Sequence, residues 1–201
     1  HRPQYMLVPI DPERRELDMK ISDIDKRLDN GWYFVYKVYL YICIVLSIIG
    51  LFQFSIILPI TLFALPDLDH FRGTPATIIN VAILILISMY VWSLHYSLVL
   101  KNAMNDKNLK GAIRGFRSMI GSSIYSLVII IGLFVAAEFV KTTLPPELRR
   151  ESWMPFYVQT FLFTLLPTCL QLFGAKKIID LLAQRDTVVQ ELNSKFGANL
   201  A

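Results

Sequence analysis

The sequence predicts an all-α integral membrane protein in which four transmembrane helices form a bundle. Three observations lead to this prediction. Four long stretches contain no charged side chain, 54% of the 201 residues are hydrophobic, and only 18% are charged. A soluble domain carries about 25% charged residues and has no need of helices as long and as apolar as these.

The ends of the uncharged stretches set the four predicted spans. They cover residues of about 38–65, 76–100, 118–137 and 152–175, within a transmembrane domain of residues 32–175. A helix rises about 1.5 Å per residue, so even the shortest stretch reaches about 30 Å, the thickness of a hydrocarbon core. Tyr and Trp side chains crowd the start of the first span, where amphipathic rings favour the headgroup level.

Amphipathic helical segments are expected at the N-terminus, in the middle loop and at the C-terminus. Within the polar residues 1–31, an apolar stripe recurs at helical spacing and consists of Leu17, Ile21, Ile24 and Leu28. This narrow stripe fits packing against another protein helix, and a solvated helix beside the membrane is the equal alternative. Asn30-Gly31 ends the pattern. The tail, residues 176–201, is expected to continue the fourth helix out of the membrane.

The middle loop, residues 101–117, carries cations at spacings of 3, 4 and 3, opposite an apolar face. This pattern predicts an amphipathic helix that lies along an anionic membrane surface. The predicted lipid-binding residues are Lys107, Lys110, Arg114 and Arg117. Within the same segment, Gly111 and Gly115 either allow close approach of another helix or soften the turn into the bilayer.

Small side chains follow one side of the third span. Ser118, Ser122 and Ser126 lie one turn apart, and Gly132 and Ala136 follow close to the same side. In lipid, small residues let helix backbones approach closely, and hydroxyl groups bond across the contact. These five residues therefore predict a helix-packing face that contacts protein rather than lipid.

Three polar side chains inside the spans form a possible polar pathway: Gln53, His95 and Gln171. Polar groups within a membrane are functional candidates because their burial in lipid is costly. His95 lies six residues before Lys101, so a hydrogen-bonded imidazole near the interface is favoured over a proton or ligand role.

Motifs for catalysis, for metal binding or for a cofactor are nearly absent from the sequence. Asp67, Asp69 and His70 are suitable metal ligands, but three ligands within four residues and no fourth favour a solvated turn. The sequence contains no metalloprotease helix, nucleophile elbow or phosphate-binding loop. Cys43 and Cys169 lie in apolar stretches without metal-ligand spacing. No cofactor is expected, and an enzyme that uses these outer carboxylates with Glu138 is strongly disfavoured.

The distribution of cations predicts the orientation in the membrane. With Lys37 set aside within the aromatic entry, fifteen cations flank one side of the spans and four flank the other. Positively charged flanks stay on the cytoplasmic or organelle-interior side, so both termini are expected there. The first residue is His1 rather than Met, and a cleaved targeting peptide and a boundary of the sequence both remain open.

Two functions are compatible with these features. The favoured one is a non-catalytic structural or accessory subunit of a larger multi-subunit membrane complex. Its partners would be other membrane protein subunits and membrane lipids, including anionic phospholipids. The alternative is a small oligomeric channel or transporter component, although ion transport usually needs ionisable groups at mid-depth. Nucleic acid is not an expected partner, because the basic stripe lacks interleaved aromatic residues and lies between two spans.

Overall fold

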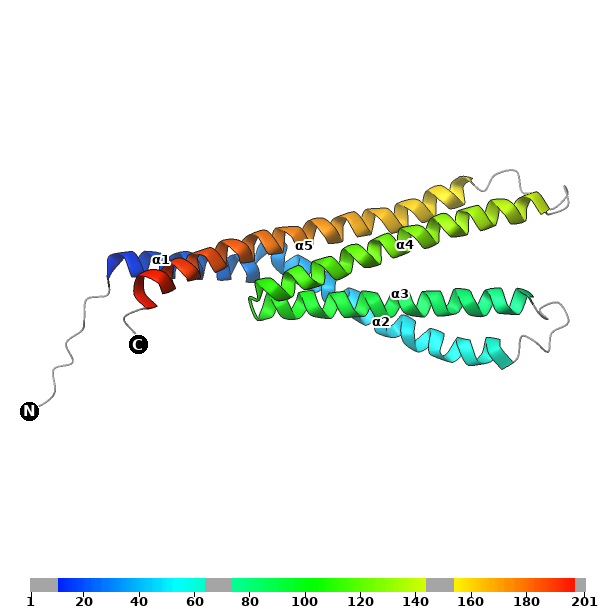
Figure 1. Ribbon diagram of the computed structural model, residues 1–201, viewed down its shortest axis with the longest axis horizontal. Coiled ribbons are helices and arrows are strands. Elements are labelled where there is room, and N and C mark those ends of the chain that lie inside the picture. Colours follow the sequence, from blue (N-terminus) through cyan, green and yellow to red (C-terminus); the bar gives the residue numbers. More distant parts are fainter. Residues whose placement is uncertain (1–10, 64–73, 144–153, 198–201) are drawn as a thin grey trace, which may run out of the picture.

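The computed structural model describes residues 11–63, 74–143 and 154–197, and these residues form five helices (Figure 1). The helices are α1 (Pro12–Asp29), α2 (Gly31–Phe63), α3 (Thr74–Asn105), α4 (Leu109–Thr143) and α5 (Met154–Phe196). No strand occurs among the described residues. The prediction of an all-α protein is confirmed. The start of α1 and the end of α5 lie at the same end of an elongated molecule (Figure 1).

Local signals in the sequence set both ends of α1. At its start, the Asp11 carboxylate accepts a hydrogen bond from the Glu13 backbone N–H at 3.0 Å, which satisfies one of the free donors of the first turn. At its end, the Asn30 side chain donates to the Lys26 carbonyl oxygen at 2.9 Å. Gly31 then has a φ of +59°, a left-handed conformation that favours glycine. The predicted break at Asn30-Gly31 therefore separates α1 from α2.

Three helical segments within the described residues are long and apolar enough to span a membrane. They are Gly31–Phe63, Asn80–Asn105 and Leu109–Gly132, with mean hydropathies of 2.4, 1.9 and 1.4. Large apolar side chains cover their outer faces, as contact with lipid tails requires. These segments fit a multi-pass membrane protein. The expected fourth span, residues 152–175, falls mostly outside the residues whose side chains the structure describes, so a count of four spans stays a prediction.

The middle loop does not form a separate surface helix, and that expectation is wrong. α3 continues to Asn105, and α4 begins at Leu109 and runs without a break through the predicted third span. A tight turn joins the two helices, in which the Asn108 backbone N–H donates to the Ala103 carbonyl oxygen at 2.9 Å. The basic residues from Lys110 onward therefore occupy the first turns of α4.

Two glycines explain why α3 and α4 form a tight hairpin here. A Cβ atom added to Gly115 would lie 2.7 Å from Leu100 Cγ, and one added to Gly111 would lie 3.2 Å from Ala103 Cβ. A larger residue at Gly115 would push the two helices apart. Of the two alternatives for these glycines, close approach of another helix is confirmed.

The same device brings α2 against α3 and α5. A Cβ atom at Gly50 on α2 would lie 2.5 Å from the Tyr90 ring on α3. At Gly174 on α5, the Tyr36 ring of α2 occupies the position that a side chain would take. Close packing of this kind is a main source of helix association in lipid, where no hydrophobic force acts between helices.

α1 packs against the C-terminal part of α5, and both project beyond the α3–α4 turn (Figure 1). We call α1 together with residues 178–196 of α5 the arm. Its buried apolar side chains include Leu17, Ile24 and Leu28 from α1 and Ile178, Leu181 and Leu182 from α5. The predicted stripe of α1 is thus confirmed as a protein-packing face, with the partner helix in the same chain. α5 also continues unbroken into the tail, as expected.

Candidate functional site

A group of polar side chains joins α2, α3 and α5 within the apolar part of the bundle. Its α2 members recur every three or four residues and therefore share one helical face: Tyr36, Tyr39, Cys43 and Ser47. Ser93 and Tyr96 belong to α3, and Gln171 belongs to α5. We call these seven residues the Gln171 cluster.

Gln171 is the centre of the hydrogen bonds in this cluster. Its Nε2 donates to the Tyr39 hydroxyl at 2.7 Å and lies 3.7 Å from Cys43 Sγ. Its Oε1 accepts from the Tyr96 hydroxyl at 3.3 Å, and its backbone carbonyl oxygen accepts from the Tyr36 hydroxyl at 2.9 Å. One residue of α5 is thereby hydrogen-bonded to both α2 and α3.

Two serines extend the cluster between α2 and α3. Ser93 Oγ donates to the Tyr96 hydroxyl at 3.3 Å, and Ser47 Oγ donates to Ser93 Oγ at 3.2 Å. Near the end of α2 and the start of α3, Thr61 Oγ1 donates to Asn80 Oδ1 at 2.7 Å. Polar groups without partners are costly in lipid, and here they satisfy one another.

The position and chemistry of the cluster favour a structural role. Gln171 precedes Lys176 by five residues, and Tyr96 precedes Lys101 by five, so the cluster lies about 8 Å along the helices from the nearest charged residues. Its members are neutral amide, hydroxyl and thiol groups, with no carboxylate, imidazole or amine. Such a network fixes helices in register but offers no strong general base.

The three residues of the predicted polar pathway do not meet in the structure. Gln171 lies in the cluster, whereas Gln53 and His95 are exposed on the outer faces of α2 and α3. No hydrogen bond joins either of these two side chains to another described residue. The bonded imidazole expected for His95 is therefore not found within the described part of the chain, because the ring faces away from the bundle. His95 borders a shallow groove with Ser88, Val91 and Trp92.

A second polar site lies where the arm meets the α3–α4 turn. The Asp25 carboxylate accepts hydrogen bonds from Lys107 Nζ and Arg185 Nε, each at 2.8 Å. We call these three residues the Asp25 clasp, and they connect α1, the turn and α5. Lys107 has a φ of +52°, an uncommon conformation for a residue other than glycine. Partial burial raises the pKa of the Asp25 carboxyl, but the bonds from Lys107 and Arg185 outweigh it and hold this pKa below its usual value.

The predicted lipid-binding cations do not act as one stripe. Lys107 belongs to the Asp25 clasp, while Lys110, Arg114 and Arg117 are exposed on the first turns of α4. Exposed cations at this level attract anionic headgroups. Lipid binding by these three residues stays a prediction.

The predicted small-residue face of α4 is divided. Ser118 Oγ accepts a hydrogen bond from Trp92 Nε1 of α3 at 3.0 Å, and Ser122 is buried. Gly132 is exposed, and a Cβ atom there would meet no atom of the chain within 4 Å. Six residues after Ser126 amount to about 240° of helix rotation, so Gly132 leaves the line and Ile130 continues it. The side chain of Ala136 lies outside the described residues.

The residues considered for an enzyme or a metal site lie outside the described part of the chain. This applies to Asp67, Asp69 and His70, and to the side chain of Glu138. Among the residues that the structure describes, no group of three His, Cys, Asp or Glu side chains is arranged to hold a metal ion.

Sequence reasoning missed the Gln171 cluster and the Asp25 clasp. The aromatic entry predicted at the start of the first span includes Tyr36 and Tyr39, although their spacing with Cys43 and Ser47 indicates one polar face within an apolar helix. This helical spacing of polar side chains is the sequence feature that could have indicated the Gln171 cluster. For Asp25 the sequence offers no signal, because several charged residues of α1 have equivalent positions and only the tertiary structure selects one.

Comparisons with protein-family models, with curated proteins and with solved structures find no match to this chain. The fold and the two sites therefore define only a class of protein. It is an all-α protein whose long apolar helices are joined by a neutral polar cluster and extended by a charged arm.

Proposed function

We propose that this protein is a non-catalytic structural or accessory subunit of a larger multi-subunit membrane complex. The observation that carries the proposal is the outward position of Gln53 on α2. Gln53 lies sixteen residues after Lys37 and ten before Phe63, the last residue of α2, about 24 Å and 15 Å along the helix, and therefore well inside the apolar stretch.

An amide at this depth needs a partner. Transfer of an amide from water to a medium without hydrogen-bonding groups costs about 4 kcal/mol or more. The Gln171 cluster satisfies its own polar groups, but Gln53 makes no hydrogen bond to the described residues of its chain. A polar group of another membrane helix removes this cost, since interhelical hydrogen bonds are a recurrent glue in lipid.

Gly132 on α4 supports the same proposal. It is exposed and open within the chain, so a helix of another subunit can approach the α4 backbone closely there. The proposed partners are other membrane protein subunits and membrane lipids, including anionic phospholipids at Lys110, Arg114 and Arg117. The proposed role includes no catalytic step, no cofactor and no nucleic acid.

The test is the mass of the particle extracted in mild detergent from native membranes. We expect a heterogeneous particle much heavier than the 23.1 kDa chain. Gln53→Leu should weaken its assembly about 3- to 20-fold, which corresponds to one interhelical hydrogen bond of about 0.6–1.7 kcal/mol. Gly132→Leu should also weaken it, although the change creates no clash within the chain. Ile49→Leu, at another exposed position of α2, is the matched control.

Either of two results would refute the proposal. One is a monomeric particle from native membranes. The other is an assembly that tolerates both Gln53→Leu and Gly132→Leu as well as it tolerates Ile49→Leu. Preserved helical content by circular dichroism would separate these effects from misfolding.

We also propose four spans, with the first half of α5 as the fourth, and both termini on the cytoplasmic or organelle-interior side. The uncharged residues 152–175 and the excess of cations on one side support this topology. Protease added outside intact membranes should cut a tag near Arg72 and spare tags at both termini. Cleavage of either terminal tag would reject this arrangement.

Gln53 also supports the alternative function, a small oligomeric channel or transporter component, under one condition. If copies of this chain surround an axis that Gln53 faces, its amides line a polar seam inside the apolar stretch. A purified homo-oligomer with no other subunit would support this alternative over the accessory subunit.

A further inference from the structure

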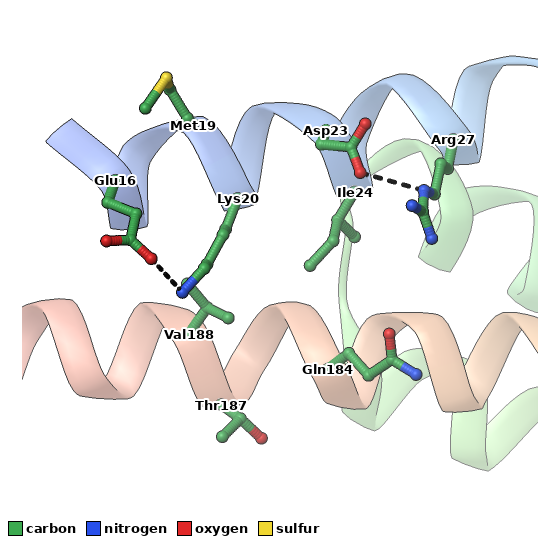
Figure 2. Close-up of a pocket in the computed structure, with 9 residues that line it drawn as sticks. All are labelled: Glu16, Met19, Lys20, Asp23, Ile24, Arg27, Gln184, Thr187 and Val188. Carbon is green, nitrogen blue, oxygen red and sulfur yellow. Dashed lines mark ion pairs between the residues drawn. The ribbon is translucent and has the colours of Figure 1, made fainter.

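An open groove runs along the arm between α1 and α5 (Figure 2). Ile24 and Val188 form its apolar floor, where each side chain points toward the opposite helix (Figure 2). Met19 projects from α1 away from α5, with 59% of its surface exposed. A single exposed apolar side chain is common on protein surfaces, so the charged residues of the groove are its informative feature.

Four charged residues of α1 line the groove in alternating sign. Glu16 pairs with Lys20 at 2.7 Å, and Asp23 pairs with Arg27 at 3.0 Å. All four side chains are more than half exposed, so the pairs are weak and free to exchange partners. The four residues are spaced 4, 3 and 4 positions apart when they are read from either end of α1. From the N-terminal end the charges are negative, positive, negative, positive, and from the C-terminal end each sign is the opposite.

This pattern is complementary to itself when a second helix runs antiparallel. With the midpoint between Ile21 and Ser22, Glu16 faces Arg27 of the second copy, and Lys20 faces Asp23. Met19 lies on the side of α1 away from α5, so the charged residues make up the contact between the two copies. A symmetric parallel pair would instead place each charge level with its own copy, and like charges repel.

We propose that the arm groove binds the arm groove of a second copy of this chain, with the two α1 helices antiparallel. Because the arm projects from one end of the spans, this pairing directs the spans of the two copies away from each other (Figure 1). The two copies therefore lie in facing membranes, and the pair acts as a tether. In each copy, the distance from the midpoint of α1 to Lys37 is about 23 Å at the rise of a helix. The two membranes would therefore lie about 45 Å apart.

The size of the arm sets the area of one such contact. α1 is 18 residues long, about 27 Å, and two adjacent helices are about 20 Å wide. Each copy therefore contributes about 500 Å², and the total is at the low end for a specific interface. A single pair is weak and salt-sensitive, and many pairs between two apposed membranes act together through a high effective concentration.

Vesicle aggregation tests the proposal with the full chain. Vesicles that carry the wild-type protein should aggregate at low salt and separate at high salt. An acidic arm (Lys20→Glu with Arg27→Glu) and a basic arm (Glu16→Lys with Asp23→Lys) should each abolish aggregation. Mixing the acidic-arm and basic-arm vesicles should restore it, because all four facing pairs are again opposite in charge. Restoration also shows that both variants are folded.

Disulfide formation tests the register. Glu16→Cys and Arg27→Cys should form a cross-link when vesicles of the two variants are mixed, since a disulfide requires Cα atoms within about 7 Å. Neither variant should cross-link with itself, because equivalent residues lie eleven positions apart along the pair, about 16 Å. Wild-type vesicles set the background from Cys43 and Cys169.

Two outcomes would overturn the tether. Self-cross-linking of Glu16→Cys would indicate parallel arms within one membrane. A failure of the mixed acidic and basic vesicles to aggregate would show that the groove does not bind a second copy, and would assign it to a different protein.

Discussion

Replacement of Gln171 by methionine tests whether the Gln171 cluster holds the bundle together. Methionine keeps the length of the side chain but removes its donor to Tyr39 and its acceptor for Tyr96. The bond from the Tyr36 hydroxyl reaches the backbone carbonyl oxygen, so it survives the change. Hydrogen bonds between membrane helices are worth about 0.6 kcal/mol on average and about 1.7 kcal/mol at most. We therefore expect a loss of about 1–3 kcal/mol in the free energy of unfolding.

The geometry also predicts which residues are energetically coupled to Gln171. Tyr39→Phe combined with Gln171→Met should cost less than the sum of the two single changes, because both remove the same 2.7 Å bond. Tyr36→Phe is the internal control, since its partner atom is retained, and its effect should add to that of Gln171→Met. The assay is reversible unfolding in mixed detergent micelles, followed by circular dichroism. Additivity for Tyr39, or equal coupling for Tyr36, would refute the arrangement of bonds around Gln171.

Three further predictions concern the clasp, the helix crossings and the exposed cations. Asp25→Asn should destabilise the arm by about 1.5–3 kcal/mol, measured as faster hydrogen exchange in α1. The folded-state pKa of Asp25 lies below its unfolded value, so the wild-type clasp should contribute fully above about pH 4 and be lost as the pH falls through the folded pKa. Gly174→Ala should lower the unfolding temperature because its Cβ meets the Tyr36 ring, whereas Gly132→Ala should leave it unchanged or raise it, and the opposite order would contradict the packing. Replacing the exposed cations of α4 by glutamine should reduce retained acidic phospholipid during purification, at about 1 kcal/mol per cation, and unchanged lipid content would exclude this role for Lys110, Arg114 and Arg117.

Hydropathy predicted where three helices cross the apolar zone but not where they end. The first predicted span, residues 38–65, lies within a helix that begins at Gly31, and the third, residues 118–137, lies within α4, which begins at Leu109. Charged residues mark the edge of the hydrocarbon, whereas backbone hydrogen bonding continues past them into the headgroup region and water. The stripe of α1 was easier to predict, because its helical period and its capping residues agree.

The sites depended on tertiary partners that no local pattern identifies. Tyr96 and Gln171 are separated by 75 residues, and Asp25 and Arg185 by 160. Sequence alone could suggest that a polar face on α2 needs a partner, but it could not choose Gln171 over other polar residues of α5. The predicted grouping of Lys107 with the cations of α4 is wrong, because Lys107 has a left-handed backbone conformation and pairs with Asp25 of α1.

The unbroken length of α5 has a mechanical consequence. This helix is 43 residues long, and the second of its two prolines, Pro167, precedes the Gln171 cluster. From Gln171 to Phe196 the helix continues without another proline, a stiff rod of about 38 Å that also carries Arg185 and Val188. A force on the arm is therefore transmitted along this rod. α5 bends most easily at Pro167, which lies on the membrane side of the Gln171 cluster. Tension between two tethered membranes would act on the hydrogen bonds from Gln171 to α2 and α3 and on the packing of α5 against α4.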